Sequence, residues 1–239
     1  MVMANRVPAL KVSIYVSEGE SHRGVPVSSA ILNFLFYRGI AGAIVTKGSA
    51  GFGAEHRLRS SHFVEISDHL PILIQFIDIQ DKVEAVLDNL QELVGNGMME
   101  IQETTILRAS DVSSGGKKSS AQPGLLQGAA CVMTIYIGES DRWNGQPLYQ
   151  ALVDALRSND VAGVTVDRGI LGYGTKKELH REHKFRLSSD LPIALSVVDT
   201  KARIQQLLPL LEQMIEQGLV VFSDAEVVTY ARRDATSAS

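Results

Sequence analysis

The sequence predicts an α+β fold of two tandem modules, each with the strand and helix order β-α-β-β-α-β. The first observation is an internal repeat, because a shift of 121 residues aligns Ala9–Arg108 with Ala130–Thr229 without a gap and with 24 identities in 100 pairs. The second observation is that apolar residues follow strand and helix periods in the same order in both copies. With right-handed crossovers, this order gives a ferredoxin-like module, in which two helices cover one face of a four-stranded antiparallel sheet.

The first strand and helix of each module come from its opening residues. Apolar strands are expected at residues 11–16 and 132–137, and a Gly-x-Pro then opens each helix at Gly24–Pro26 and Gly145–Pro147. Proline is favoured in the first helical turn, where its missing N–H breaks no hydrogen bond. Helical spacing follows in the apolar residues Ala30, Ile31, Phe34 and Leu35 of the first copy, and Leu148, Ala151, Leu152, Ala155 and Leu156 of the second.

The remaining elements follow in matching order. Strands are expected at 42–47 and 163–168, 72–78 and 193–199, and 98–106 and 219–228, and helices at 81–94 and 201–215. Gly97 and Gly218 suit a left-handed residue that ends each helix. Since both helices cover one sheet face, the opposite face needs a partner, and oligomerisation is expected.

These patterns predict four regions along the 239 residues. They are a first, diverged module over 1–109, a flexible linker over 110–128, a second module over 129–231 and a disordered tail over 232–239. The linker is rich in Ser, Gly and Lys and has little to bury. Its Gly115–Ser119 run does not match a phosphate-binding loop, since Lys118 stands where Ser or Thr is needed and no strand precedes it.

Composition excludes several classes of protein. The net charge of -4 argues against a general nucleic-acid-binding protein, because the chain has no large positive field to attract phosphates. The single cysteine, Cys131, forms no intrachain disulfide or thiol-rich metal site. The N-terminal residues lack a signal-peptide pattern and no apolar stretch is long enough for a membrane span, so a cytoplasmic protein is expected.

The segments between the second and third strands, 49–69 and 170–190, are longer than hairpin loops usually are. We therefore expect functional loops there. The second carries more cations than the first, so an anion should prefer the second copy. Counted from residue 168 to residue 186, these cations are Arg168, Lys176, Lys177, Arg181, Lys184 and Arg186, whereas the corresponding stretch of the first copy has Lys47, Arg57 and Arg59.

Glycines mark the start of each loop. Phosphate can approach backbone N–H groups where side chains are missing, which makes Gly169, Gly172, Tyr173 and Gly174 candidate ligand residues. Their weaker equivalents in the first module are Gly48, Gly51, Phe52 and Gly53. The alternative is that these glycines only supply a positive φ at a tight turn.

Further candidates flank these glycines. Glu139, which matches Glu18, and Ser188 with Ser189 are polar residues near strand ends. They could bind a ligand hydroxyl, amine or anion, or they could be ordinary solvated or capping turn residues.

The loop histidines raise a metal alternative, in which His180 and His183 bind one ion. No framework of carboxylates or thiols accompanies them, so no metal site is assigned. Catalysis is not expected either, because no nucleophile-elbow, HExxH or Cys-His arrangement is present.

The second copy contains a combination of five motifs, Ile135–Trp143, Gly145–Tyr149, Ala162–Val166, Arg168–Gly174 and Leu187–Ile193. Together these motifs closely resemble the PII-like DUF190 family. The resemblance implies the ferredoxin-like fold, trimers with nucleotide clefts between subunits, a phosphate-facing turn at Gly169–Gly174 and a mobile loop at Thr175–Ser189. The first copy resembles a diverged member, because its loop has lost cations.

The resemblance implies a non-enzymatic regulatory protein without a required cofactor. An adenine nucleotide, such as ATP, ADP, AMP or a cyclic nucleotide, or a similar anion would bind at a subunit cleft, and the loop would regulate a membrane transporter or an enzyme. Two alternatives stay open, a trimeric metal-binding module using the loop histidines and a purely structural assembly protein.

Overall fold

The fold is described from a computed structural model of the chain. It describes residues 6–51, 59–60, 70–95, 97–107, 128–174, 180–181 and 190–227. The predicted tail, and the predicted linker apart from residue 128, lie outside these residues.

The main elements of the first module follow the predicted order. They are β1 (Arg6–Ser17), α1 (Val27–Tyr37), β4 (Ala43–Lys47), β7 (Pro71–Asp78), α2 (Gln80–Val94) and β8 (Met98–Leu107). Short strands β2 (Ser21–His22) and β3 (Val25–Pro26) form a hairpin before α1, and β5 (Ala50–Gly51) pairs with β6 (Arg59–Ser60).

The second module repeats this order. Its main elements are β9 (Gly128–Gly138), α3 (Leu148–Ser158), β12 (Val164–Arg168), β15 (Pro192–Asp199), α4 (Lys201–Met214) and β16 (Leu219–Val227). Short strands β10 (Arg142–Trp143) and β11 (Gln146–Pro147) precede α3. The strand orders β8-β1-β7-β4 and β16-β9-β15-β12 are those of two ferredoxin-like modules, which confirms the predicted fold class.

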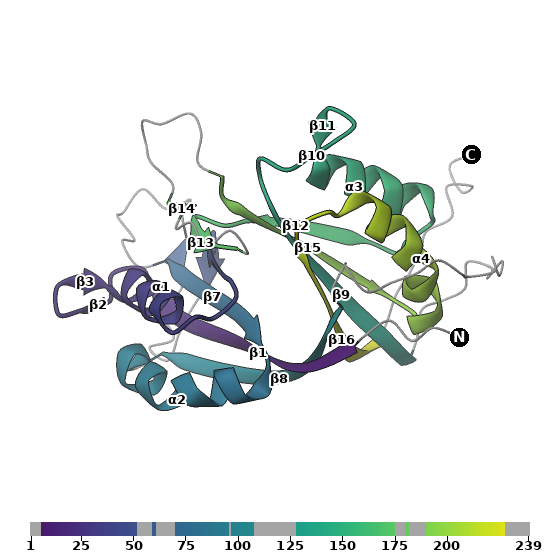
Figure 1. The fold of residues 1–239 in the computed structure, drawn as a ribbon. Coiled ribbons are helices and arrows are strands. Elements are labelled where there is room, and N and C mark those ends of the chain that lie inside the picture. Colours follow the sequence, from purple (N-terminus) through teal and green to yellow (C-terminus); the bar gives the residue numbers. More distant parts are fainter. Residues whose placement is uncertain are drawn as a thin grey trace, which may run out of the picture.

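The two modules share one curled antiparallel sheet of ten strands. β8 pairs with β16 on one side, and on the other side β4 pairs with β13 (Leu171–Tyr173), which in turn pairs with β14 (His180–Arg181). Figure 1 shows the sheet bending between the modules, with α1 and α2 outside one half and α3 and α4 outside the other. The helix-free faces of both halves therefore turn toward each other within one chain.

Alternating strand residues divide the core into three clusters. One cluster lies between the first module's strands and helices and contains Ile14, Ile74 and Phe76, while Met133 and Ile135 belong to the matching cluster of the second module. A smaller third cluster lies on the helix-free face and contains Ala9, Ile77, Ile106 and Val221, with Tyr136 and Leu219 packed against it. Residues from both modules meet in this third cluster.

A buried aspartate at the end of β7 and of β15 secures the same connection in each module. Asp78 accepts hydrogen bonds from the backbone N–H groups of Ala41 and Ile79, at 3.0 and 2.9 Å. Asp199 accepts from those of Ala162 and Thr200, at 3.1 and 2.7 Å. Each carboxylate thus ties the segment before β4 or β12 to the start of a helix.

The predicted left-handed conformation at Gly97 and Gly218 is wrong. The left-handed residue after α2 is Gly95, with φ of 59°. Gly97 is needed for close packing, because a Cβ there would lie 2.6 Å from the Tyr15 carbonyl oxygen. A Cβ on Gly218 would likewise lie 2.9 Å from the carbonyl oxygen of Tyr136.

The segment 170–190, expected as a loop throughout, contains β13 and β14. β13 forms because the edge of β4 in the other module is available to it, a contact that local periodicity does not reveal. None of the described helices is long and apolar enough to cross a membrane.

Candidate functional site

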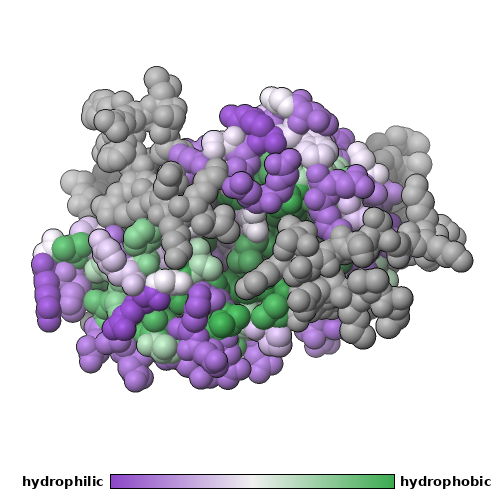
Figure 2. Space-filling model, in the orientation of Figure 1, coloured by the Kyte–Doolittle hydropathy of each residue, from purple (hydrophilic) through white to green (hydrophobic). Residues whose placement is uncertain are grey.

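A cavity of about 140 Å³ lies where the two modules meet on the helix-free face, and we call it the seam cavity. Its walls come from β4 and β7 of the first module and from β9, β13, β15 and β16 of the second. Apolar side chains gather in the hollow between the two halves of the molecule (Figure 2). Both modules are therefore needed to form the cavity.

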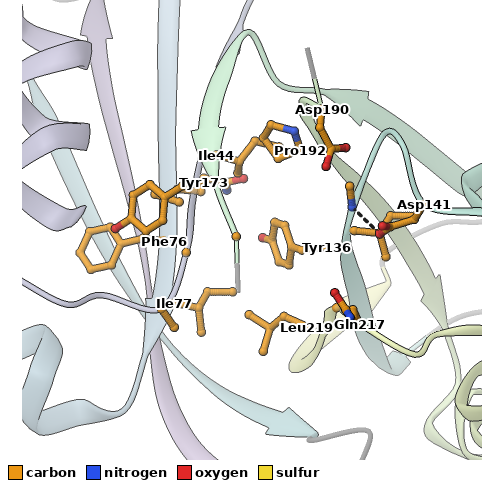
Figure 3. Close-up of a pocket in the computed structure, with 18 residues that line it drawn as sticks. Ile44, Phe76, Ile77, Tyr136, Asp141, Tyr173, Asp190, Pro192, Gln217 and Leu219 are labelled. Atoms are coloured by element: carbon orange, nitrogen blue, oxygen red, sulfur yellow. Dashed lines mark hydrogen bonds between the residues drawn. The ribbon is translucent and has the colours of Figure 1, made fainter. Parts of the chain in front are cut away.

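Most of the wall is apolar. Ile44 and Ile77 border the cavity from the first module, and Pro192 and Leu219 border it from the second (Figure 3). Phe76 also touches the cavity, but its ring belongs to the core of the first module. Such walls exclude water and favour an apolar or aromatic ligand surface.

Tyr136 lies between these walls (Figure 3). Its hydroxyl oxygen is buried and has no hydrogen-bond partner among the described residues. Burial, with a smaller contribution from the nearby charge of Asp167, raises the pKa of this phenol above its ordinary value. The hydroxyl is therefore neutral at physiological pH and can both donate and accept a hydrogen bond.

Two carboxylates form a polar edge of the seam cavity. Asp141 accepts a hydrogen bond of 2.8 Å from the Gly138 N–H, and Asp190 accepts one of 2.8 Å from the Ser140 N–H. A Cβ on Gly138 would lie 2.9 Å from one Asp190 oxygen and 3.4 Å from an Asp141 oxygen, so the carboxylates converge over this glycine. No Lys, Arg or His lines the described part of the wall, and its charge is therefore negative.

The candidate turn at Gly169 and Gly172 lies against the seam, where the chain crosses from β12 to β13. A Cβ on Gly172 would lie 2.5 Å from the Ala43 carbonyl oxygen and 2.6 Å from Pro192 Cγ, and one on Gly169 would lie 2.8 Å from Pro192 Cγ. The N–H of Gly169 already donates to the Pro192 carbonyl at 2.8 Å. These glycines allow close packing of strands from different modules.

The alternative interpretation of these glycines, a positive φ, is wrong. The positive φ values among the described glycines occur at Gly24, Gly39, Gly95 and Gly145. Gly174 lines the seam cavity and has open space where a Cβ would stand.

Tyr173 contributes to the first module instead of its own. Its ring is 2% exposed and belongs to the first module's core, and its hydroxyl has no described partner. Burial, and to a lesser extent Asp78, raise the pKa of this phenol. The ring therefore fastens β13 to the neighbouring module.

Glu139 and Arg168 pair with each other at the ends of β9 and β12. Arg168 Nε and Nη2 donate to the two carboxylate oxygens at 2.7 and 2.9 Å. The repeat-equivalent residues Glu18 and Lys47 form the same ion pair in the first module. Glu139 and Arg168 therefore form an ion pair that occurs in both modules, and neither residue lines the seam cavity.

The first-module equivalents are only partly described. The Gly48 N–H donates to the Pro71 carbonyl at 2.9 Å, as Gly169 does to Pro192, and Gly51 lies in β5. Phe52 and Gly53 lie outside the described residues. Among the described strands, β5 pairs with β6 and not with the second module. Its counterpart β13 does pair with the other module, so the two copies differ at this position.

Ser188, Ser189 and His183 also lie outside the described residues, and His180 is described only as part of β14. Within the described ranges, no group of three or more His, Cys, Asp or Glu side chains is placed to hold a metal ion.

Sequence reasoning missed Tyr136, Asp141 and Asp190 as cavity residues. The identity of Tyr136 with Tyr15 across the repeat was a signal for an important position, but not for a buried hydroxyl. Only the pairing of the two modules gives Tyr136 its surroundings.

Comparisons with known proteins place the chain in a family. The model of DUF190, described as "Uncharacterized ACR, COG1993", matches residues 9–106 and 130–227. A UPF0166 protein of Methanocaldococcus jannaschii is 33% identical over 99 residues, which cover 41% of this chain and 91% of the relative. A UPF0166 protein of Aquifex aeolicus is 30% identical over 97 residues, with the same two coverages of 41% and 91%.

Two solved structures are similar only at a low level. An unknown protein from Galdieria sulphuraria has a TM-score of 0.25 and 9% identity, over 92% of this chain and 98% of that one. A dye-decolorizing protein from V. cholerae has a TM-score of 0.24 and 11% identity, over 90% and 93%. Neither similarity supports a conclusion about function. The two family matches together span most of the sequence, and the chain belongs to the DUF190 (UPF0166) family as a tandem pair of its modules.

Proposed function

We propose that this chain is a non-catalytic regulatory protein that binds the nucleoside part of an adenine nucleotide in the seam cavity. The segment Thr175–Ser189, which follows β13, would pass the bound state to a partner such as a membrane transporter or an enzyme. This proposal takes its ligand class from the resemblance to PII proteins and its site from the geometry.

The observation that carries the proposal is the position of β13. Its last residue, Tyr173, and the adjacent Gly174 form part of the cavity wall, and the strand is paired with β4 of the other module. A ligand that touches both walls binds best when β13 and β4 are paired. Binding and pairing are therefore coupled, and the segment after β13 begins in a different state with and without ligand.

The lining chemistry supports binding more than catalysis. The apolar walls suit the face of an aromatic base, and the tyrosine and carboxylates offer hydrogen bonds to its edge. The described lining residues contain no Ser, Cys or His, and both carboxylates already accept hydrogen bonds from backbone N–H groups. The cations Lys176 and Lys177 follow Gly174 closely in the sequence and suit the phosphates of a nucleotide.

We further propose a homotrimer, as the resemblance to PII proteins implies. The seam itself is formed within one chain, so the trimer would assemble from surfaces other than the seam. It would add the opportunity to bind a partner with several chains at once.

Titration calorimetry with ATP, ADP, AMP and cyclic AMP, with and without magnesium, tests the function. At least one nucleotide should bind, and Leu219→Ala should weaken it because part of the apolar cavity wall is lost. Tyr37→Ala, at an 84% exposed position outside the cavity, is the matched control. Absence of heat with all four nucleotides, supported by absence of thermal stabilisation, would reject the proposal.

A further inference from the structure

We propose that the seam cavity takes an uncharged aromatic ring with a hydrogen-bonding edge, and that the Tyr136 hydroxyl recognises this edge while charged groups of the ligand stay outside. This inference rests on the proposed function and deepens it, since it states which part of the ligand enters.

The internal repeat provides the comparison that identifies Tyr136. Tyr15 occupies the equivalent position in the first module, where its side chain is 37% exposed and its hydroxyl donates to Glu100 at 3.4 Å. The Tyr136 hydroxyl is buried without a described partner. Among the described residues, the same side chain at the same point of the fold therefore has a hydrogen-bond partner in the first copy and none in the second.

An unsatisfied buried hydroxyl lowers stability, and buried tyrosines usually find a partner. Phenylalanine would fill the same space without that loss. Tyr136 borders a cavity with room for about five water molecules, so a ligand atom can supply the missing hydrogen bond. Ligand binding would therefore explain why this position has tyrosine, whereas packing alone would be met by phenylalanine.

The charges around the cavity decide which part of a ligand enters. Asp141 and Asp190 are the charged residues of the described wall, and no described cation there would offset a phosphate. A phosphate group in the cavity would be repelled by both carboxylates. A neutral ring whose N–H groups point to the carboxylates and whose acceptor meets Tyr136 satisfies all three side chains.

The size of the cavity agrees with one ring system. A volume of about 140 Å³ beside Tyr136 and Leu219 suits one ring system better than a whole nucleotide. The ligand's sugar and any phosphates would then extend through the opening. Adenosine, which has the ring but no phosphate, should therefore still bind.

Calorimetry on the full-length protein with adenosine, AMP and inorganic pyrophosphate tests this assignment. Adenosine and AMP should bind with dissociation constants that differ by less than about ten-fold, and pyrophosphate should neither bind nor displace adenosine. Tyr136→Phe should weaken adenosine binding about ten-fold, the value of one hydrogen bond to a neutral group. Tyr15→Phe, the repeat-equivalent change, should leave it unaltered.

Two further measurements test the assignment without relying on the affinity of the Tyr136→Phe variant. Tyr136→Phe should raise the thermal midpoint of the ligand-free protein, because the unsatisfied hydroxyl is gone. Asp190→Asn should increase AMP affinity relative to adenosine affinity, because one repelling charge is gone while an oxygen still accepts from Ser140.

The outcomes separate this inference from the function on which it rests. If neither adenosine nor AMP binds the wild-type protein, the proposed function fails and the inference falls with it. If both bind but Tyr136→Phe retains full affinity, or pyrophosphate displaces adenosine, the inference alone is overturned and the nucleotide site stands.

Discussion

Tyr173 of the second module packs edge-on against Phe36 of the first, with ring centroids 5.1 Å apart and ring planes at 87°. This contact joins residues that the repeat assigns to different modules. It makes β13 a working part of the first module's core, together with the neighbouring Leu171. The two copies are therefore joined by side-chain packing as well as by strand pairing.

Tyr173→Ala should lower the free energy of unfolding by about 3–5 kcal/mol, because a buried aromatic ring leaves a cavity in a core that both modules share. Urea denaturation measures the change. Tyr173→Phe keeps the ring and removes a buried hydroxyl without a described partner, so it should be neutral or stabilising. A loss for Phe as large as that for Ala would contradict the packing role.

Gly172→Ala should destabilise the protein by about 1–3 kcal/mol, because the new methyl group would overlap the Ala43 carbonyl oxygen and the Pro192 ring. Gly174→Ala is the matched control two residues later, where open space awaits a Cβ. Thermal unfolding of both variants measures the difference. Equal midpoints would show that β13 does not need close approach at Gly172.

Asp199→Ala should lower the free energy of unfolding by about 2–4 kcal/mol, because the buried carboxylate that accepts from the N–H groups of Ala162 and Thr200 is removed. Asp224→Ala should change it by less than about 0.5 kcal/mol, since this side chain is 80% exposed and its ion pair with Lys201 lies at the surface. Chemical denaturation compares the two. Similar effects of both changes would refute the anchoring role of Asp199.

Alkaline pH should destabilise the fold through Tyr136 and Tyr173. Burial, aided by Asp167 and Asp78 respectively, raises the pKa of each phenol, so the native state holds these protons to higher pH than the unfolded chain does. The associated stability is present below the ordinary tyrosine pKa of about 10 and is lost as pH rises above it. Denaturation between about pH 9 and pH 11 should show a decline that is shallower in the double Phe variant. An unchanged slope in that variant would argue against these two groups.

Ligand stoichiometry should be one per chain although the chain holds two modules. β13 bridges to β4, whereas its counterpart β5 pairs only with β6 among the described strands. Calorimetric stoichiometry, combined with the assembly mass from light scattering, measures this number. Three sites per trimer are expected, and six would mean that the first module forms an equivalent site.

The sequence was sufficient for the modules because their determinants are local and occur twice. Apolar periods and the constant shift of 121 residues predicted each main strand and helix without knowledge of their contacts. The position of the second copy's glycine turn at a module boundary was not predictable in this way. Its partner, β4, lies more than a hundred residues earlier, and pairing across that distance leaves no local period.

The candidate site was predicted in part for the same reason. Tyr173 and Gly174 were named from their glycine-rich motif and line the cavity. Glu139 and Arg168 were named from their charges and position, yet they form an ion pair with each other. Tyr136 looks the same as Tyr15 in the sequence, and the difference between them comes only from what the other module places beside each ring.

The packing of β13 into the first module has a consequence for how the gene can be divided. A first copy expressed alone would lack the Leu171 and Tyr173 side chains that complete its interior, and a second copy alone would carry them uncovered. Separately produced halves should therefore be poorly soluble but recover on mixing. The first copy therefore depends on side chains that the second copy supplies.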